Sequence, residues 1–215
     1  MDERQTASAH AARDAAIVVR DLQCRRGDRV LFAPTSFVVA AGAIVWVRGA
    51  NGQGKTTLLR TLAGLSGPDA GAIERPATRP PLYLAHANAL KDDLTVAESL
   101  RFLLQLAGAS VDAATIDGAL EHLGVASRRN AFVRTLSQGQ RRRVALARLA
   151  AAREPLPWLL DEPFDALDTG GVAIVADLIA EHARGGGSVV LTSHLPVPID
   201  TPAPTVVQLH EPAMA

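Results

Sequence analysis

A glycine-rich stretch carries the strongest chemical signal in the sequence. Residues 49 to 56 read G-A-N-G-Q-G-K-T, which fits the pattern G-x-x-x-x-G-K-[ST] of a phosphate-binding loop. Glycine permits backbone angles that let loop N–H groups turn toward phosphate oxygens, and a helix N-terminus behind the loop adds positive potential. The residues predicted to bind nucleotide are Gly49, Ala50, Asn51, Gly52, Gln53, Gly54, Lys55, Thr56 and Thr57.

Two side chains of this loop have distinct expected roles. Lys55 should reach the β- and γ-phosphates, and the Thr56 hydroxyl should ligate Mg²⁺. Lysine occurs only at positions 55 and 91, whereas the other 20 of the 22 basic residues are arginine. A compact ammonium on a flexible stem fits inside a phosphate loop where a planar guanidinium would not. The choice of lysine at position 55 therefore supports the phosphate-loop interpretation.

The elements around the loop predict the fold class. The apolar run 44–47 reads as a buried parallel strand, and the leucine spacing over 56–65 predicts a helix behind the loop. Strands and helices then alternate, which predicts an α/β fold with a doubly wound, mostly parallel sheet and ligands at the carboxyl ends of its strands. Further strands are expected at 17–19, 30–32, 36–40, 82–85, 157–163, 188–192 and 205–209, helices at 96–106, 113–123 and 172–182, and a turn at 67–71.

This pattern also predicts the domain organisation. The short strands before residue 41 indicate a small N-terminal antiparallel β subdomain, and the helices between about 86 and 134 indicate a helical subdomain. Thr95, followed by Glu98 at the capping-box position, is a plausible N-cap for the first of these helices. We expect one domain over 15–215, after a flexible polar tail at 1–14 that has no apolar segment of the signal-peptide kind.

Composition excludes several classes of function. The formal net charge is +0 and the pI is 7.0, so nothing favours nucleic acid as a partner. Cys24 is the only cysteine, which excludes an intrachain disulfide and a thiolate zinc cluster. The longest apolar run, 37–47, is too short to cross a bilayer, so a membrane role would require a partner.

A second group of chemical residues follows two later strands. Asp161 and Glu162 end the apolar run before Pro163. In a fold with a phosphate loop, a carboxylate there faces the Mg²⁺ site, so Asp161 is predicted to hold the water shell of the metal. Glu162 could accept a proton from the attacking water. His194 follows the next strand, where it could hydrogen-bond the γ-phosphate.

The segment from Leu136 to Leu149 predicts another anion site. Ser137 can cap the helix that runs from Gly139 onward, which would expose a second helix N-terminus. The alternative is a serine that only caps its own helix. The chain thus carries two candidate phosphate-binding devices that are far apart in sequence.

The order of these motifs resembles an ATP-binding domain of the ABC transporters. The resemblance covers nearly the whole chain and rests on residues 49–56, L-S-Q-G-Q at 136–140, L-L-D-E-P at 159–163, A-L-D at 166–168 and His194. It implies an ATP hydrolase that uses Mg²⁺ and pairs head to tail as a homodimer. Each ATP would lie between Lys55 of one protomer and Ser137 and Gly139, in the signature motif at 136–140, of the other. The resemblance implies signature residues Ser137, Gln138, Gly139 and Gln140, with Asp168 at the dimer seam.

Longer stretches are similar to one branch of these domains, the CcmA family of cytochrome c biogenesis. The stretches are T-L-L-R-T-L-A-G-L-S-G-P-D-A-G, L-L-D-E-P-F-D-A-L-D and L-T-S-H-L-P-V-P. The resemblance implies a peripheral subunit on the cytoplasmic face of the inner membrane, bound to integral membrane permease subunits. These partners would handle the haem, so no direct haem contact is expected. Either haem translocation or release of a haem–chaperone complex would fit.

Three positions depart from the ABC pattern. Arg26 occupies the place of the usual adenine-stacking aromatic residue, and a guanidinium can also stack on a π-face. His86 stands where a glutamine usually links nucleotide and membrane partner, and an imidazole could replace its hydrogen bond. Gln138 replaces a signature glycine, so this position cannot need a conformation reserved for glycine.

Two other functions remain open at this point. One is the ATPase subunit of a small ABC transporter for another substrate. The other is a soluble ABC protein that acts on ribosomes or DNA, although such proteins usually carry two cassettes or a long coiled-coil insert, and neither pattern occurs in the sequence.

Overall fold

The computed structural model describes residues 15–75, 80–152 and 154–212, which form two compact units. The first unit holds the described residues up to Tyr83, the segment Pro155–Asp161 and the residues from Ala180 onward. The second holds Leu84–Glu154, apart from position 153, and Glu162–Ile179. The tail predicted at 1–14 lies outside the described residues, and the helical-subdomain boundaries at 86–134 stay a prediction.

A five-stranded sheet forms the centre of the first unit, in the order β10-β5-β9-β8-β7. The pairings β10/β5, β5/β9 and β8/β9 are all parallel, as the apolar runs predicted. Every residue of β8 and β9 is buried, which explains why these strands read as continuous apolar runs rather than alternating ones. The strands are β5 (Ile44–Arg48), β7 (Leu82–Leu84), β8 (Trp158–Leu160), β9 (Val189–Thr192) and β10 (Thr205–Gln208).

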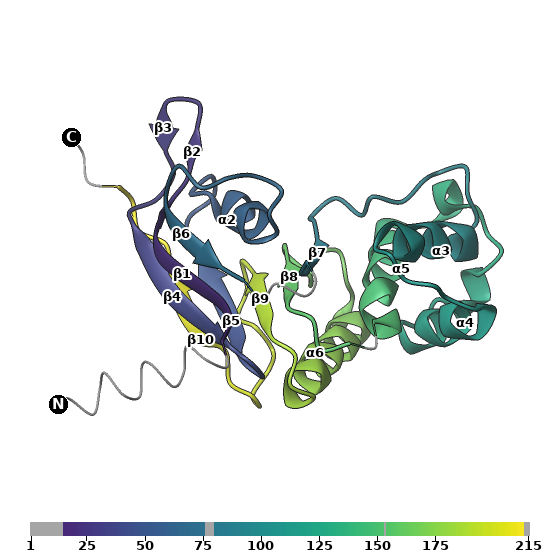
Figure 1. The fold of residues 1–215 in the computed structure, drawn as a ribbon. Helices are drawn as coiled ribbons and strands as arrows, with labels where there is room; N and C mark the ends of the chain where they lie inside the picture. Colours follow the sequence, from purple (N-terminus) through teal and green to yellow (C-terminus); the bar gives the residue numbers. More distant parts are fainter. Residues whose placement is uncertain (1–14, 76–79, 153, 213–215) are drawn as a thin grey trace. The chain divides into compact units, whose positions relative to one another are not determined.

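The first unit also contains a three-stranded antiparallel sheet in the order β4-β1-β6 (Figure 1). The predicted N-terminal antiparallel strands are therefore present, together with the hairpin of β2 and β3. Strand β6 was not predicted, and only a turn was expected there, because its sequence A-G-A-I-E has no alternating apolar pattern. The bounds are β1 (Ala15–Gln23), β2 (Arg25–Arg26), β3 (Arg29–Val30), β4 (Thr35–Ala40) and β6 (Ala70–Glu74).

Helix α2 (Lys55–Leu62) packs its leucines into the core of this unit. Leu58, Leu59 and Leu62 are fully buried among residues of both sheets. The helix predicted to reach Leu65 ends three residues earlier, because the chain turns at Gly64 in the left-handed region and leaves Leu65 58% exposed.

The described part of the second unit is helical. It contains α3 (Val96–Leu106), α4 (Ala113–His122), α5 (Gln138–Ala151), short 3₁₀ turns at Ala126–Arg128 and Val133–Thr135, and most of α6 (Thr169–Arg184). Both α3 and α4 pack on α5. The predicted capping box of α3 is confirmed, since the Thr95 hydroxyl accepts from the Glu98 N–H and the Glu98 carboxylate accepts from the Thr95 N–H.

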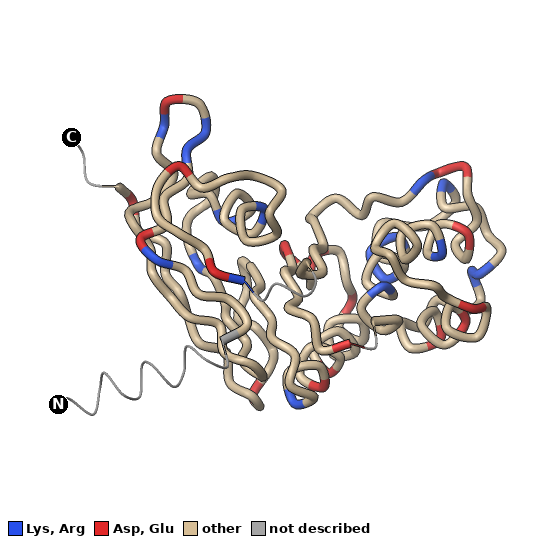
Figure 2. Tube along the Cα trace, viewed as in Figure 1, with Lys and Arg blue, Asp and Glu red and all other residues tan. Residues whose placement is uncertain are grey.

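Charge is spread along both units. Basic and acidic positions are interspersed along the trace in Figure 2. Within the described ranges, no helix is long and apolar enough to cross a membrane.

A stacked pair of rings links the end of α6 to β8. The Trp158 and His182 rings lie 3.6 Å apart and nearly parallel, and His182 Nε2 lies 2.8 Å from the Leu156 carbonyl oxygen. A side chain at Gly187 would overlap the imidazole, so this glycine is required by close approach. Burial lowers the pKa of His182, and the Leu156 hydrogen bond only partly offsets that shift.

We predict that His182 makes folding stability depend on pH. A histidine with a lowered pKa in the folded state stabilises the fold above its unfolded pKa of about 6.5, and this contribution is lost as the pH falls toward the folded value. Urea unfolding across this range should show a smaller loss of stability at low pH for His182→Phe, which keeps a stacking ring but cannot take up a proton. His122→Gln, at the exposed end of α4, serves as the control and should follow the wild type. An unchanged pH dependence in His182→Phe would contradict the prediction.

Candidate functional site

The phosphate loop leads directly into α2. Gly52 and Gly54 both take left-handed backbone angles, with φ values of 76° and 95°. A Cβ at Gly54 would lie 2.8 Å from Leu31 Cβ, so the loop packs too closely here for any side chain. Among the described residues, no side chain caps the N-terminus of α2. Its first N–H groups are therefore available to an anion, as at other phosphate-binding helix termini.

Lys55 and Gln53 hold the loop from two sides. The buried Lys55 ammonium donates to the carbonyl oxygens of Gly49 and Ala50 at 2.8 and 3.3 Å. The Gln53 amide oxygen accepts from the Ala50 N–H at 2.6 Å, and its amide nitrogen donates to the Leu209 carbonyl at 3.1 Å. The Gln53 side chain thus braces the loop against the end of β10. The motif could not predict this role, because its pattern leaves position 53 unspecified.

The structure brings together the two residues predicted to hold Mg²⁺. Thr56 Oγ1 donates to Asp161 Oδ2 at 2.8 Å, and Thr192 Oγ1 donates to Asp161 Oδ1 at 2.9 Å. Asp161 is only 2% exposed. Burial raises the pKa of the nearby Tyr83 phenol, and the Asp161 charge raises it further. Thr192 was missed from sequence, since a threonine at the end of an apolar strand carries no motif.

This donor set fits Mg²⁺ bound mainly through phosphate and water. Mg²⁺ prefers hard oxygen ligands and commonly takes one or two from protein while it keeps several waters. Thr56 and Asp161 supply a hydroxyl and a carboxylate side by side. In the part of the chain that the structure describes, no group of three or more His, Cys, Asp or Glu residues could hold a metal by itself.

The predicted second anion site lies in the second unit at the start of α5. The Ser137 hydroxyl accepts from the Gln140 N–H at 3.2 Å, and the Gln140 side chain accepts from the Ser137 N–H at 3.0 Å. This reciprocal capping box confirms Ser137 as the N-cap. Gln138 is the first residue of α5, an ordinary helical position, which agrees with the expectation that no glycine is needed there.

The 166–168 segment packs against this helix start. A Cβ at Gly139 would lie 2.9 Å from the Ala166 carbonyl oxygen. The Asp168 carboxylate accepts from the Gly171 N–H at 2.9 Å and from Arg143 Nη2 at 2.5 Å. These two hydrogen bonds, the Gly171 one first, lower the pKa of Asp168. The packing fixes the carboxylate predicted to lie at a dimer seam.

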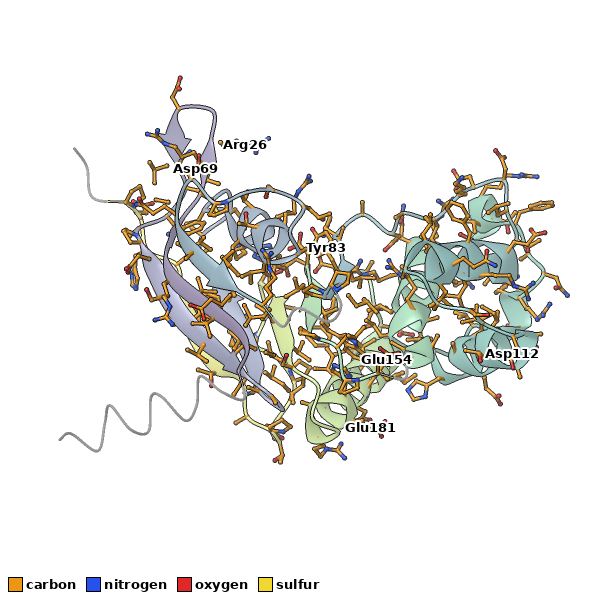
Figure 3. The ribbon with its side chains drawn as sticks, viewed as in Figure 1. Arg26, Asp69, Tyr83, Asp112, Glu154 and Glu181 are labelled. Carbon is orange, nitrogen blue, oxygen red and sulfur yellow. The ribbon has the colours of Figure 1, made fainter. Side chains whose placement is uncertain are left out.

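The remaining predicted residues fall in both units. Glu162 is 7% exposed and belongs to the second unit, with His86, whose Nδ1 lies 3.7 Å from Asp165 Oδ2. His194 follows β9 in the first unit and is exposed. The Arg26 side chain extends away from the β2–β3 hairpin of the first unit (Figure 3). The sequence-predicted residues therefore fall into two groups by unit: the phosphate loop, Arg26, Asp161 and His194 in the first, and the signature, His86, Glu162 and Asp168 in the second.

Comparisons with known proteins agree with these motifs. The family model described as "ABC transporter" matches residues 32–165. A cytochrome c biogenesis ATP-binding export protein CcmA of Aromatoleum aromaticum is 47% identical over 203 residues, which cover 90% of this chain and 94% of that protein. A protein of the same name from Vibrio cholerae is 41% identical and covers 90% of this chain and 98% of its own.

Solved structures give the same fold. One, described as the ATP-binding subunit of an ABC transporter, superposes with a TM-score of 0.78 at 25% identity and covers 91% of this chain and 86% of its own. An ABC transporter ATP-binding protein from Pyrococcus furiosus superposes with a TM-score of 0.77 at 27% identity and covers 90% of this chain and 96% of its own. The predicted α/β fold of the ABC ATPase type is confirmed.

Gly139→Ala should test the packing of the 166–168 segment. The added methyl group would meet backbone rather than a movable side chain, so we expect the segment to shift and ATP hydrolysis to fall roughly tenfold or more. Nucleotide affinity should stay within about twofold, because the phosphate loop belongs to the other unit. Gly118→Ala is the matched control, since a Cβ on that exposed face of α4 meets nothing within 4 Å. Wild-type hydrolysis by Gly139→Ala would contradict the prediction.

Proposed function

Since the chain belongs to the ABC transporter family, and within it to the CcmA family of ATP-binding subunits, we propose that it hydrolyses ATP for a membrane complex that exports haem or releases a haem chaperone during c-type cytochrome biogenesis. The ATPase activity follows from membership of the family. The main structural support for nucleotide and Mg²⁺ binding is the hydrogen bond between Thr56 and Asp161. It lies at the N-terminus of α2, which has no side-chain cap.

The first unit supplies the nucleotide-binding half of the reaction. Loop N–H groups and the Lys55 ammonium would hold the β- and γ-phosphates, with Arg26 against the adenine. Thr56 and Asp161 would hold Mg²⁺, which neutralises phosphate charge when it is bound. Lys55 already donates to loop carbonyls, so it needs only to exchange acceptors when phosphate arrives.

Most of the residues proposed for cleavage belong to the second unit. The Glu162 carboxylate would take a proton from water as the water oxygen bonds to the γ-phosphorus, and the bridging oxygen leaves with ADP. His194, from the first unit, would hydrogen-bond the γ-phosphate. Ser137 and Gly139 would contact the ATP of a second copy of the chain, with Gln138 and Gln140 in the same signature and Asp168 at the seam. The placement of residues 137–140 at the capped start of α5 supports this arrangement.

His86 has a proposed role in contact with the membrane partners. Integral membrane permease subunits would bind the chain at the cytoplasmic face of the inner membrane and carry all contact with haem. His86 would connect nucleotide state to these partners, as a glutamine does in related domains. Its exposure and its position 3.7 Å from Asp165 support a role as an accessible hydrogen-bonding group. A small ABC transporter for another substrate is the alternative.

Glu162→Gln should separate binding from hydrolysis. The amide cannot take up the proton of the attacking water, so turnover should fall at least about a hundredfold while ATP binding persists. ATP should then trap a dimer, which size-exclusion chromatography with light scattering would detect. Unlike Glu162→Gln, the Lys55→Ala variant should lose nucleotide affinity in addition to turnover. Near wild-type turnover by Glu162→Gln would eliminate Glu162 as the base.

The haem role predicts a specific defect in cells. In a bacterium that lacks its own CcmA-type subunit, the wild-type chain should restore c-type cytochromes, whereas Glu162→Gln should not. Haem staining of periplasmic proteins measures this outcome, and the haem spectrum of the complex purified from membranes tests the partners. Haem uptake by ATP-loaded proteoliposomes would distinguish translocation from chaperone release. Failure of the active wild-type ATPase to restore cytochromes would favour the transporter of another substrate.

A further inference from the structure

A buried arginine joins two chain segments that surround the predicted catalytic base. Arg142 lies on α5 and is 2% exposed. Its Nη1 donates to the carbonyl oxygens of Ala85 and His86 at 3.1 and 3.2 Å and to Asn88 Oδ1 at 3.1 Å. Its Nη2 donates to the Glu162 carbonyl oxygen at 2.5 Å. All five residues belong to the second unit.

Both segments held by Arg142 contain unusual backbone conformations. Glu162 has a φ of 49°, and Ala89, which follows Asn88, has a φ of 53°. Residues with a Cβ seldom adopt this left-handed region, and they persist there only when their surroundings fix them. At Glu162 the backbone angles also set the direction in which the carboxylate leaves the chain. A donor fixed to the adjoining carbonyl therefore acts on the orientation of that carboxylate.

The adjacent arginines of α5 have different partners. Arg141 pairs with Asp92, and Arg143 donates to the Leu123 carbonyl and pairs with Asp168. Arg142 uses its planar fork to contact the 85–88 segment through Nη1 and the Glu162 carbonyl oxygen through Nη2. A lysine carries its donors on a single atom and could not span the same acceptors.

We propose that Arg142 is a positioning residue for ATP hydrolysis: it couples the signature end of α5 to the orientation of Glu162 and of the 85–88 loop that carries His86. The inference rests on the proposed ATPase function. When the N-terminus of α5 meets the nucleotide of the partner, a displacement of the helix passes through the Arg142 guanidinium to the backbone of the catalytic base. Hydrolysis thereby becomes sensitive to whether the signature is engaged.

The test is a comparison of turnover with nucleotide affinity. Arg142→Lys, which keeps the buried charge, should lower kcat about 10- to 100-fold, the range expected for a misplaced catalytic group. KM and the ATP dissociation constant should change less than about twofold, because the phosphate loop is in the other unit. Arg141→Lys, one residue away on the same helix, is the matched control and should keep wild-type kcat.

Two further variants separate positioning from a role in folding alone. Arg142→Lys in the Glu162→Gln background should still form the ATP-trapped dimer as well as Glu162→Gln does. Asn88→Ala removes one acceptor from the loop side without disturbing the buried charge, and it should lower kcat while thermal stability stays near the wild type. Its effect should also be non-additive with Arg142→Lys, as expected for residues in one hydrogen-bond network.

The outcomes distinguish this inference from the proposed function. Wild-type kcat in Arg142→Lys or Asn88→Ala, with an active wild-type enzyme, would overturn the inference alone. A parallel loss of kcat, nucleotide affinity and dimer trapping would assign Arg142 to folding and overturn it as well. A wild-type chain that showed no ATPase activity with its membrane partners would overturn the proposed function and this inference with it.

Discussion

A buried carboxylate fixes the position of the phosphate loop. Asp161 accepts one hydrogen bond from the first turn of α2 and another from the end of β9, while its own backbone continues from β8. Burial makes an unpaired carboxylate costly, so both hydroxyl donors are needed for this arrangement. Three elements that are distant in sequence therefore meet at one side chain. The same bond places a hydroxyl and a carboxylate together, and both are oxygen ligands of the kind that Mg²⁺ prefers.

The chain passes from the first unit to the second between Asp161 and Glu162. The residue that would hold the metal and the residue that would take the proton are thus neighbours in sequence but belong to different compact units. Glu162 adopts left-handed backbone angles directly after this passage. Local strain of this kind is stable only when nearby groups over-determine it. The Arg142 hydrogen bond to the Glu162 carbonyl supplies such a constraint from within the second unit.

The sequence predicted the elements and motifs better than the contacts between side chains. Apolar runs located β5, β8 and β9 because strands buried on both faces leave a strong signal, whereas the small residues of β6 leave none. Motif spacing identified Thr56 and Asp161, whose hydrogen bond the structure then showed. The roles of Gln53 and Arg142 depend on partners 156 and at least 20 positions away, so no local pattern could reveal them.

The two helix starts that are predicted to bind anions are built in different ways. The start of α2 relies on glycine conformations and a lysine that is already folded over the loop. The start of α5 is closed by the Ser137 capping box, which already occupies two of its N–H groups. A serine hydroxyl that accepts from Gln140 still has its own hydrogen to donate. The capping box therefore does not compete with a phosphate for Ser137; it holds the hydroxyl in place, so that a nucleotide from a partner chain would meet an ordered donor rather than a mobile loop.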